Sequence, residues 1–166
     1  MEFDPSVIAW FKAAWPGPLV RTSGWLFPFG EVIHFIGLCL LFGSLIFIDL
    51  RLMGWFKELS VKAVLALVPY AMIGLTMNML SGWLFFTSAP DTYLENPAFI
   101  VKMILVFLAT ANAVFFTLYE QRKVAMIGPG ESAPRMAQIL AGSSLGLWLL
   151  ILLIGRWLPI FTVGTN

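Results

Sequence analysis

The chain has 166 residues, of which 60% are hydrophobic and only 11% are charged. A soluble domain carries about 25% charged residues, so this composition excludes an ordinary water-soluble protein and indicates an integral membrane protein. The net charge of +1 gives no reason to expect binding of nucleic acid. The single cysteine, Cys39, excludes an internal disulfide and a cysteine cluster for zinc or iron–sulfur. Its apolar neighbours predict a small buried side chain.

The N-terminal segment, residues 5–18, is apolar, contains Trp10 and Trp15, and ends at Pro16 and Pro18. Segments of this composition tend to lie in the membrane–water interface, so we expect an interfacial helix here. The first four residues contain two acids and no base, whereas a cleavable signal peptide begins with basic residues. No cleaved signal is therefore expected.

Four long apolar runs follow. A helix needs about 20 mostly apolar residues to cross the hydrocarbon core of a bilayer, and within lipid every backbone group must be bonded internally. We therefore predict an all-α integral membrane protein, a four-transmembrane-helix bundle that forms a single membrane domain over residues 1–166. The predicted spans are roughly 29–48, 63–86, 99–119 and 137–161.

The loops between these runs differ in charge. The first and third loops carry most of the basic residues, and the second loop, Thr87–Pro97, is acidic. Lysine and arginine concentrate in cytoplasmic loops, so we expect loops one and three to be cytoplasmic and both termini to be periplasmic, in a bacterial inner membrane. The basic loop residues are Arg51, Lys57, Lys62, Arg122, Lys123 and Arg135.

Ionisable groups inside membrane spans are costly and often functional. With the predicted topology, Glu31, His34, Lys102 and Arg156 share one depth near the outer surface, and Asn78 lies in the outer half of the second helix. We therefore consider these five residues, together with a glycine discussed next, as one candidate cofactor-binding site.

His34 is the only histidine in the chain and a candidate metal or haem ligand, because imidazole is a common ligand for both. The alternative is a polar side chain bonded to a neighbouring helix. Gly37 lies one turn further along the same face; it provides room for a flat macrocycle or for close helix packing. Glu31 is expected to accept the second N–H of His34 and fix the tautomer that binds the ligand.

Lys102 and Arg156 are candidates to hold anionic groups such as haem propionates or lipid phosphates. The alternative is that each side chain extends to the headgroup layer. Met77 or Met79 is a possible second axial ligand of a haem, although methionines in such helices usually fill gaps in the core.

Two further groups of residues carry predictions about packing. Asp49 and Arg51 end the first span, where we expect an interfacial ion pair with a neighbouring loop. Stripes of small residues let membrane helices approach closely, so Gly146 is expected to lie against another helix. The stripes are Gly142 and Gly146, Gly74, Asn78 and Gly82, and Ala109 and Ala113.

Several stretches resemble an uncharacterised family of small bacterial four-helix inner-membrane proteins. They are EVIHFIGLCLLFGSLIFIDLRLMG, GWLFFTSAPDTYLENPAFIVKM, LATANAVFF and LLIGRWLPIF. This resemblance implies the fold and carries no activity. The H-x-x-G pattern at His34 and Gly37 is also similar to copper-resistance D-type and cytochrome b-like membrane proteins. Those proteins have more histidines, so the similarity implies that bis-histidine ligation here needs His34 from two subunits.

These features favour a haem b-binding or redox-associated inner-membrane subunit with its site near the periplasmic face. The alternatives are a non-catalytic structural or assembly subunit, and a small-molecule or quinone-binding membrane protein. The sequence contains no P-loop, dinucleotide fingerprint, zincin motif or nucleophile elbow. The expected partners are the lipid bilayer and further copies of the chain or a larger membrane complex, and no nucleic acid.

Cysteine labelling tests the predicted orientation. In a variant in which Cys39 is replaced, a cysteine at Glu58 or Ser132 should resist a membrane-impermeant thiol reagent applied to intact spheroplasts, while a cysteine at Thr92 should react. Labelling at Ser132 without labelling at Thr92 would mean the opposite orientation.

Overall fold

The computed structural model describes residues 3–163, except for the side chains of Pro159 and residues 161–163. The described part is helical and contains no strand. Its elements are α1 (Pro5–Ala13), α2 (Gly17–Thr22), α3 (Leu26–Leu52), α4 (Val61–Leu65), α5 (Val68–Ser88), α6 (Pro90–Leu94), α7 (Pro97–Phe115), the π-helix η1 (Phe116–Glu120), α8 (Gln121–Val124) and α9 (Arg135–Val163).

Four helical segments are long and apolar enough to cross a membrane, which confirms the predicted all-α, four-helix, multi-pass architecture. They are Leu26–Leu52, Val61–Ser88, Pro97–Val124 and Arg135–Leu158. Some ends are set by capping: the Asn96 side chain accepts a bond from the Ala98 N–H at 2.9 Å and so starts α7.

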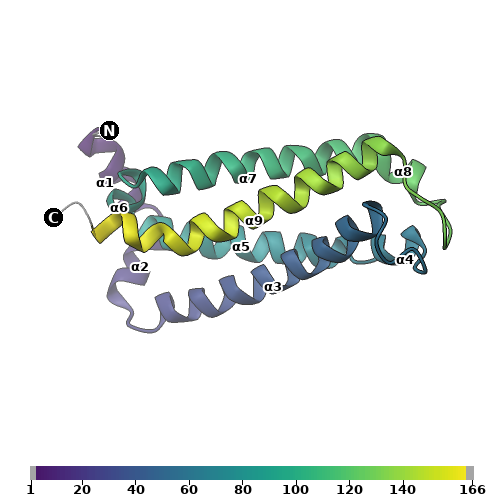
Figure 1. Ribbon diagram of the computed structural model, residues 1–166. Helices are drawn as coiled ribbons and strands as arrows, with labels where there is room; N and C mark the ends of the chain where they lie inside the picture. Colours follow the sequence, from purple (N-terminus) through teal and green to yellow (C-terminus); the bar gives the residue numbers. More distant parts are fainter. Residues whose placement is uncertain (1–2, 164–166) are drawn as a thin grey trace.

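The bundle consists of two closely packed helix pairs. α3 packs along α5 and α7 packs along α9, and the pairs join where α3 meets α9. α1, α2 and α6 lie at one end of the bundle, and α4 and α8 lie at the other (Figure 1). The connection between α5 and α7 is therefore at the end that also carries the N-terminal helices.

Two clusters of buried side chains form the core. One lies near the α4–α8 end and the other lies midway along the bundle. The first comprises Ile48, Leu52, Val61, Val64, Val124, Ala133, Ala137 and Ala141, and the second comprises Leu41, Ala71, Ala109, Trp148 and Ile151.

Many large apolar side chains point outward instead, such as Phe107 of α7, which is 72% exposed. Lipid tails are as apolar as these side chains, so such exposure is not costly in a bilayer. The prediction that Cys39 is buried is wrong, because its side chain is exposed. The buried face of α3 includes Gly37 and Leu41, and Cys39, two residues from each, lies on the opposite side of the helix.

The Arg51 side chain is fully buried at the end of α3 and joins two loops. Its Nε donates to the carbonyl of Leu59, and its Nη2 donates to the carbonyls of Gly128 at 3.1 Å and Glu131 at 3.2 Å. The sequence predicted an ion pair for Arg51. That prediction is wrong, because the loops offer carbonyl oxygens to the guanidinium and no described carboxylate forms a salt bridge with it.

Asp49 also does not form the predicted ion pair. Its side chain is 4% exposed, its carboxyl group faces the side chain of Ser144 on α9, and its Oδ2 has no hydrogen-bond partner among the described residues. The position of Asp49 on α3 explains this, since the carboxyl group is turned into the bundle and away from the loop cations.

Further bonds hold the same two loops together. The Gly130 N–H donates to the carbonyl of Lys57 at 2.7 Å, and the Val61 N–H donates to the carbonyl of Ile127 at 3.2 Å. The Lys57 Nζ donates to the Ser132 hydroxyl at 3.1 Å. Hydrogen bonds therefore tie the loop of residues 53–60 to the loop of residues 125–134.

At the opposite end, α1 and α2 fold against α5 and α6. Lys12 forms a salt bridge with Asp91 at 3.0 Å, and Arg21 donates to the carbonyl of Thr87 at 2.9 Å. The Trp83 indole donates to the carbonyl of Trp15 at 3.0 Å. Residues 5–18, predicted as one interfacial helix, thus contain α1 and the start of α2, and they cover the end of the bundle.

Glycine allows the closest approach between two helices. A Cβ built on Gly74 would lie 2.5 Å from the backbone N of Leu41 and 2.6 Å from the carbonyl O of Gly37, which is closer than real Cβ atoms come. The prediction for Gly146 is wrong for contacts within the described chain, because a Cβ added there meets no atom within 4 Å. The small-residue stripes pack unevenly: Ala109 is buried and Ala113 is exposed.

Gly74→Ala should separate α3 from α5. We expect it to lower the stability by about 1–3 kcal/mol through overpacking, measured as thermal unfolding in detergent. Gly82→Ala is the matched control on the same helix, because a Cβ there meets open space and alanine is the better helix former by about 1 kcal/mol. Equal stability of the two variants would contradict the close approach.

Candidate functional site

His34 lies on α3 and faces α5. Its half-buried ring, on α3, has Nδ1 2.8 Å from the Ser81 hydroxyl on α5. Lys102, on α7, is close enough for its charge to act on the imidazole. A Cβ added to Gly155 of α9 would lie 3.5 Å from the Nζ of Lys102. Lys102 is thus the nearest cation that acts on His34, and no hydrogen bond joins the two side chains in the described chain.

The Ser81 hydroxyl determines which nitrogen of His34 is free. This hydroxyl donates its one proton to the carbonyl of Met77 at 2.6 Å, so it meets Nδ1 as an acceptor. In the neutral ring, Nδ1 then carries the hydrogen and Nε2 keeps its lone pair. Nε2 has no hydrogen bond from the described residues. With this orientation of the hydroxyl, Nδ1 is the donor of the imidazole and Nε2 is its free nitrogen.

Glu31 does not have the predicted role, because Ser81 is the partner of the His34 Nδ1. Glu31 is exposed on α3, and its charge acts on Tyr93 of α6. Burial, and secondly the charge of Glu31, raise the pKa of the Tyr93 phenol. Glu31 thus faces the loop at the end of the bundle.

Gly37 gives no space for a macrocycle between α3 and α5. A Cβ there would lie 2.6 Å from the Nδ2 of Asn78 and 3.0 Å from both the carbonyl O of Gly74 and the Cβ of Met77. The sequence allowed two interpretations of Gly37, space for a cofactor or close helix packing, and the structure shows close helix packing. Asn78 belongs to this contact: its Nδ2 donates to the Gly74 carbonyl at 2.8 Å, and its buried Oδ1 has no partner among the described residues.

The remaining candidates are less closely placed. Arg156 is exposed on α9, and within the described chain it forms no salt bridge with Glu31. Met79 is exposed, and the Cβ of Met77 packs against Gly37. Neither methionine side chain is bonded to His34 in the described chain, so a second axial ligand from the same chain has no support in the geometry.

Ser81 is the residue that the sequence reasoning missed. A signal was available, because Ser81 follows Asn78 by three residues in a strongly apolar helix, and residues three apart share a helix face. A buried serine in a span needs a polar partner, and His34 is the one that it finds.

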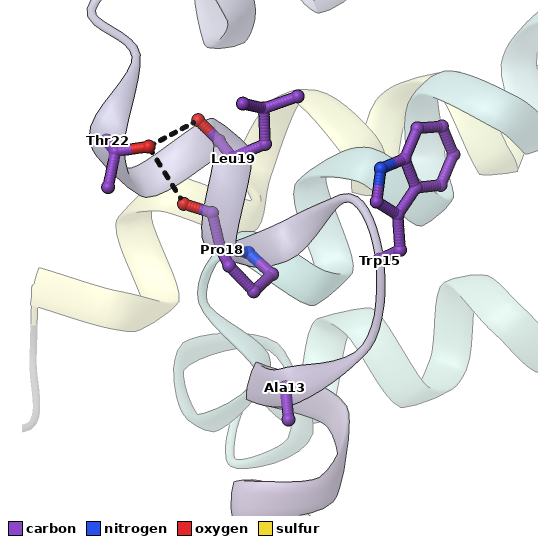
Figure 2. A pocket seen from close by; sticks show the side chains of 5 residues that line it. All are labelled: Ala13, Trp15, Pro18, Leu19 and Thr22. Carbon is purple, nitrogen blue, oxygen red and sulfur yellow. Dashed lines mark hydrogen bonds between the residues drawn. The ribbon is translucent and has the colours of Figure 1, made fainter.

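A shallow pocket of about 480 Å³ lies elsewhere, at the elbow between α1 and α2. Figure 2 shows its lining by Ala13, Trp15, Pro18, Leu19 and Thr22, with the Thr22 hydroxyl donating to the carbonyls of Pro18 and Leu19, both at 3.1 Å. No ionisable side chain lines this pocket, so it offers no chemistry comparable with that at His34.

No protein-family model matches this chain, and no curated protein and no solved structure is significantly similar to it.

The single histidine allows a direct test of the tautomer. In protein labelled with ¹⁵N-histidine, at a pH where the ring is neutral, NMR should show the Nδ1–H form. Ser81→Ala removes the acceptor, so the tautomer should become mixed and the stability should fall by about 1–3 kcal/mol. Ser88→Ala, on the same helix, is the control and should leave the imidazole signals unchanged. A predominant Nε2–H form in the wild type would refute the assignment.

Proposed function

We propose that this protein is a haem b-binding membrane subunit, in which the Nε2 of His34 would hold the haem. The observation that carries the proposal is the 2.8 Å contact of the His34 Nδ1 with the Ser81 hydroxyl, which would leave Nε2 as the free nitrogen when the hydroxyl donates to Met77. Metal-ligating histidines commonly donate their other N–H to a protein acceptor in this way. Bound haem b would supply one-electron chemistry.

The proposal requires two copies of the chain. Each copy has one histidine, and the tight contact between Gly37 and Gly74 leaves no slot for a macrocycle between α3 and α5. A haem bound by two His34 side chains would therefore lie between copies, outside the α3–α5 contact. Lys102 and the exposed Arg156 are the cations that would meet its propionates.

The location of the site is part of the same proposal. The basic loops lie at the end that carries α4 and α8 (Figure 1), whereas His34 lies in the first third of α3, toward the opposite end. With those loops cytoplasmic, the haem would lie near the periplasmic face of a bacterial inner membrane.

A second candidate function is a structural or assembly subunit. It is favoured by the observation that the His34–Ser81 bond also ties α3 to α5, next to the closest backbone approach of the two helices. In this case His34 satisfies the hydrogen-bonding needs of two helices in lipid and binds no cofactor.

The absorbance spectrum of the purified protein distinguishes the two functions. After expression with sufficient haem supply, the wild type should show a Soret band, with one haem for two chains. His34→Gln should insert and unfold like the wild type, because its amide can still donate to Ser81, but it should lack the band. A colourless wild type that also fails to bind added haem, or equal haem content in the two proteins, would refute the haem site. A stable, colourless pair of proteins is the result expected of a structural subunit.

A further inference from the structure

The end of the bundle formed by residues 53–60 and 125–134 exposes large apolar side chains. Trp55 is 63% exposed and Met126 is 87% exposed. The group, called here the apolar rim, consists of Met53, Trp55, Phe56, Leu59 and Met126. Loops that extend freely into water seldom gather such side chains, because a contiguous exposed apolar patch usually marks an interaction site.

The apolar rim is held in a fixed shape. Arg51 binds the carbonyls of both loops from inside, and Phe56 has φ of +49°. A bulky residue rarely adopts this left-handed conformation, and it persists only where the surroundings enforce it. Phe56 also lies near the exposed Phe47 of α3, with ring centroids 6.4 Å apart, so the rim continues onto the outer surface of the first span.

Cations surround the apolar rim. The exposed basic residues at this end are Lys57, Lys62, Arg122, Lys123 and Arg135, and the exposed acids are Glu58 and Glu131. The other two acids here, Asp49 and Glu120, are buried, and Glu120 is bonded to Lys123 at 2.7 Å. Exposed cations therefore outnumber exposed acids at the end of the bundle that carries the apolar rim.

We infer that this end of the protein binds the headgroups of anionic phospholipids, with the apolar rim inserted into the interface of the bilayer. Tryptophan and other aromatic side chains concentrate at the level of the headgroups, and lysine and arginine next to a span are attracted to anionic lipids. The site lies at the ends of all four spans, which places it at a membrane surface in either orientation. The inference does not depend on haem binding at the opposite end.

The charges argue against a protein as the main occupant. The centres of protein–protein interfaces are depleted of lysine. Here Lys57 lies between Phe56 and Leu59 of the apolar rim, and Lys62 follows Leu59 by three residues. Exposed cations without carboxylate partners suit phosphate groups. Lys62, Arg122 and Arg135 are such cations, because none of them forms a salt bridge within the described chain.

Native mass spectrometry can measure the lipid preference. Protein purified in mild detergent is given equal amounts of phosphatidylglycerol and phosphatidylcholine, and the retained lipids are counted. We expect the wild type to retain several times more phosphatidylglycerol. The triple variant Lys62→Gln, Arg122→Gln, Arg135→Gln should lose this preference. Lys12→Gln is the control, and it should keep the preference because Lys12 lies at the other end of the bundle. This variant should also fold, because the ion pair of Lys12 with Asp91 is exposed and so adds little to stability.

Two further measurements keep the test decisive. If the triple variant does not fold, high salt applied to the wild type should abolish the preference, because salt screens exposed charges. In bilayers with lipids brominated near the headgroup, the quenching of tryptophan fluorescence should be smaller in Trp55→Phe than in the wild type. Equal retention of both lipids by the wild type, or a preference that survives in the folded triple variant, would overturn the inference.

Discussion

The guanidinium of Arg51 is fully buried at the end of α3, and no described carboxylate forms a salt bridge with it. A buried charge of this kind is stabilised by hydrogen bonds that replace its hydration. The carbonyls of Leu59, Gly128 and Glu131 accept bonds from its Nε and Nη2, while its Nη1 has no partner among the described residues. Because these carbonyls belong to two different loops, solvating one side chain fixes the relative position of the first and third connections, and with them the ends of all four spans.

The same constraint explains the other polar contacts between the helices. Within lipid a polar side chain has only protein groups as partners. His34 finds Ser81 across the α3–α5 pair, and Asn112 of α7 donates to the Leu140 carbonyl of α9 at 3.0 Å. Each pair of closely packed helices thus has at least one bond from a side chain to its partner helix, in addition to its packing.

The close approach at Gly37 and Gly74 limits what the histidine can do. Since the two backbones nearly touch there, the imidazole cannot serve a cofactor inserted between α3 and α5. The tight packing at Gly37 and Gly74 thus excludes a cofactor from this part of the α3–α5 contact.

The sequence by itself determined that this is a membrane protein and how many spans it has. A chain with 60% hydrophobic residues and four apolar runs of membrane length does not suit a water-soluble fold. It also predicted one depth for His34 and Lys102 from helix direction alone. Only the tertiary structure decided that Ser81 is the partner of His34, that Gly37 packs against Gly74, and that Arg51 binds carbonyls. These facts depend on which face each helix turns toward its neighbour. In a membrane protein apolar residues cover both the inner and the outer faces, so hydrophobic periodicity carries little information about rotation.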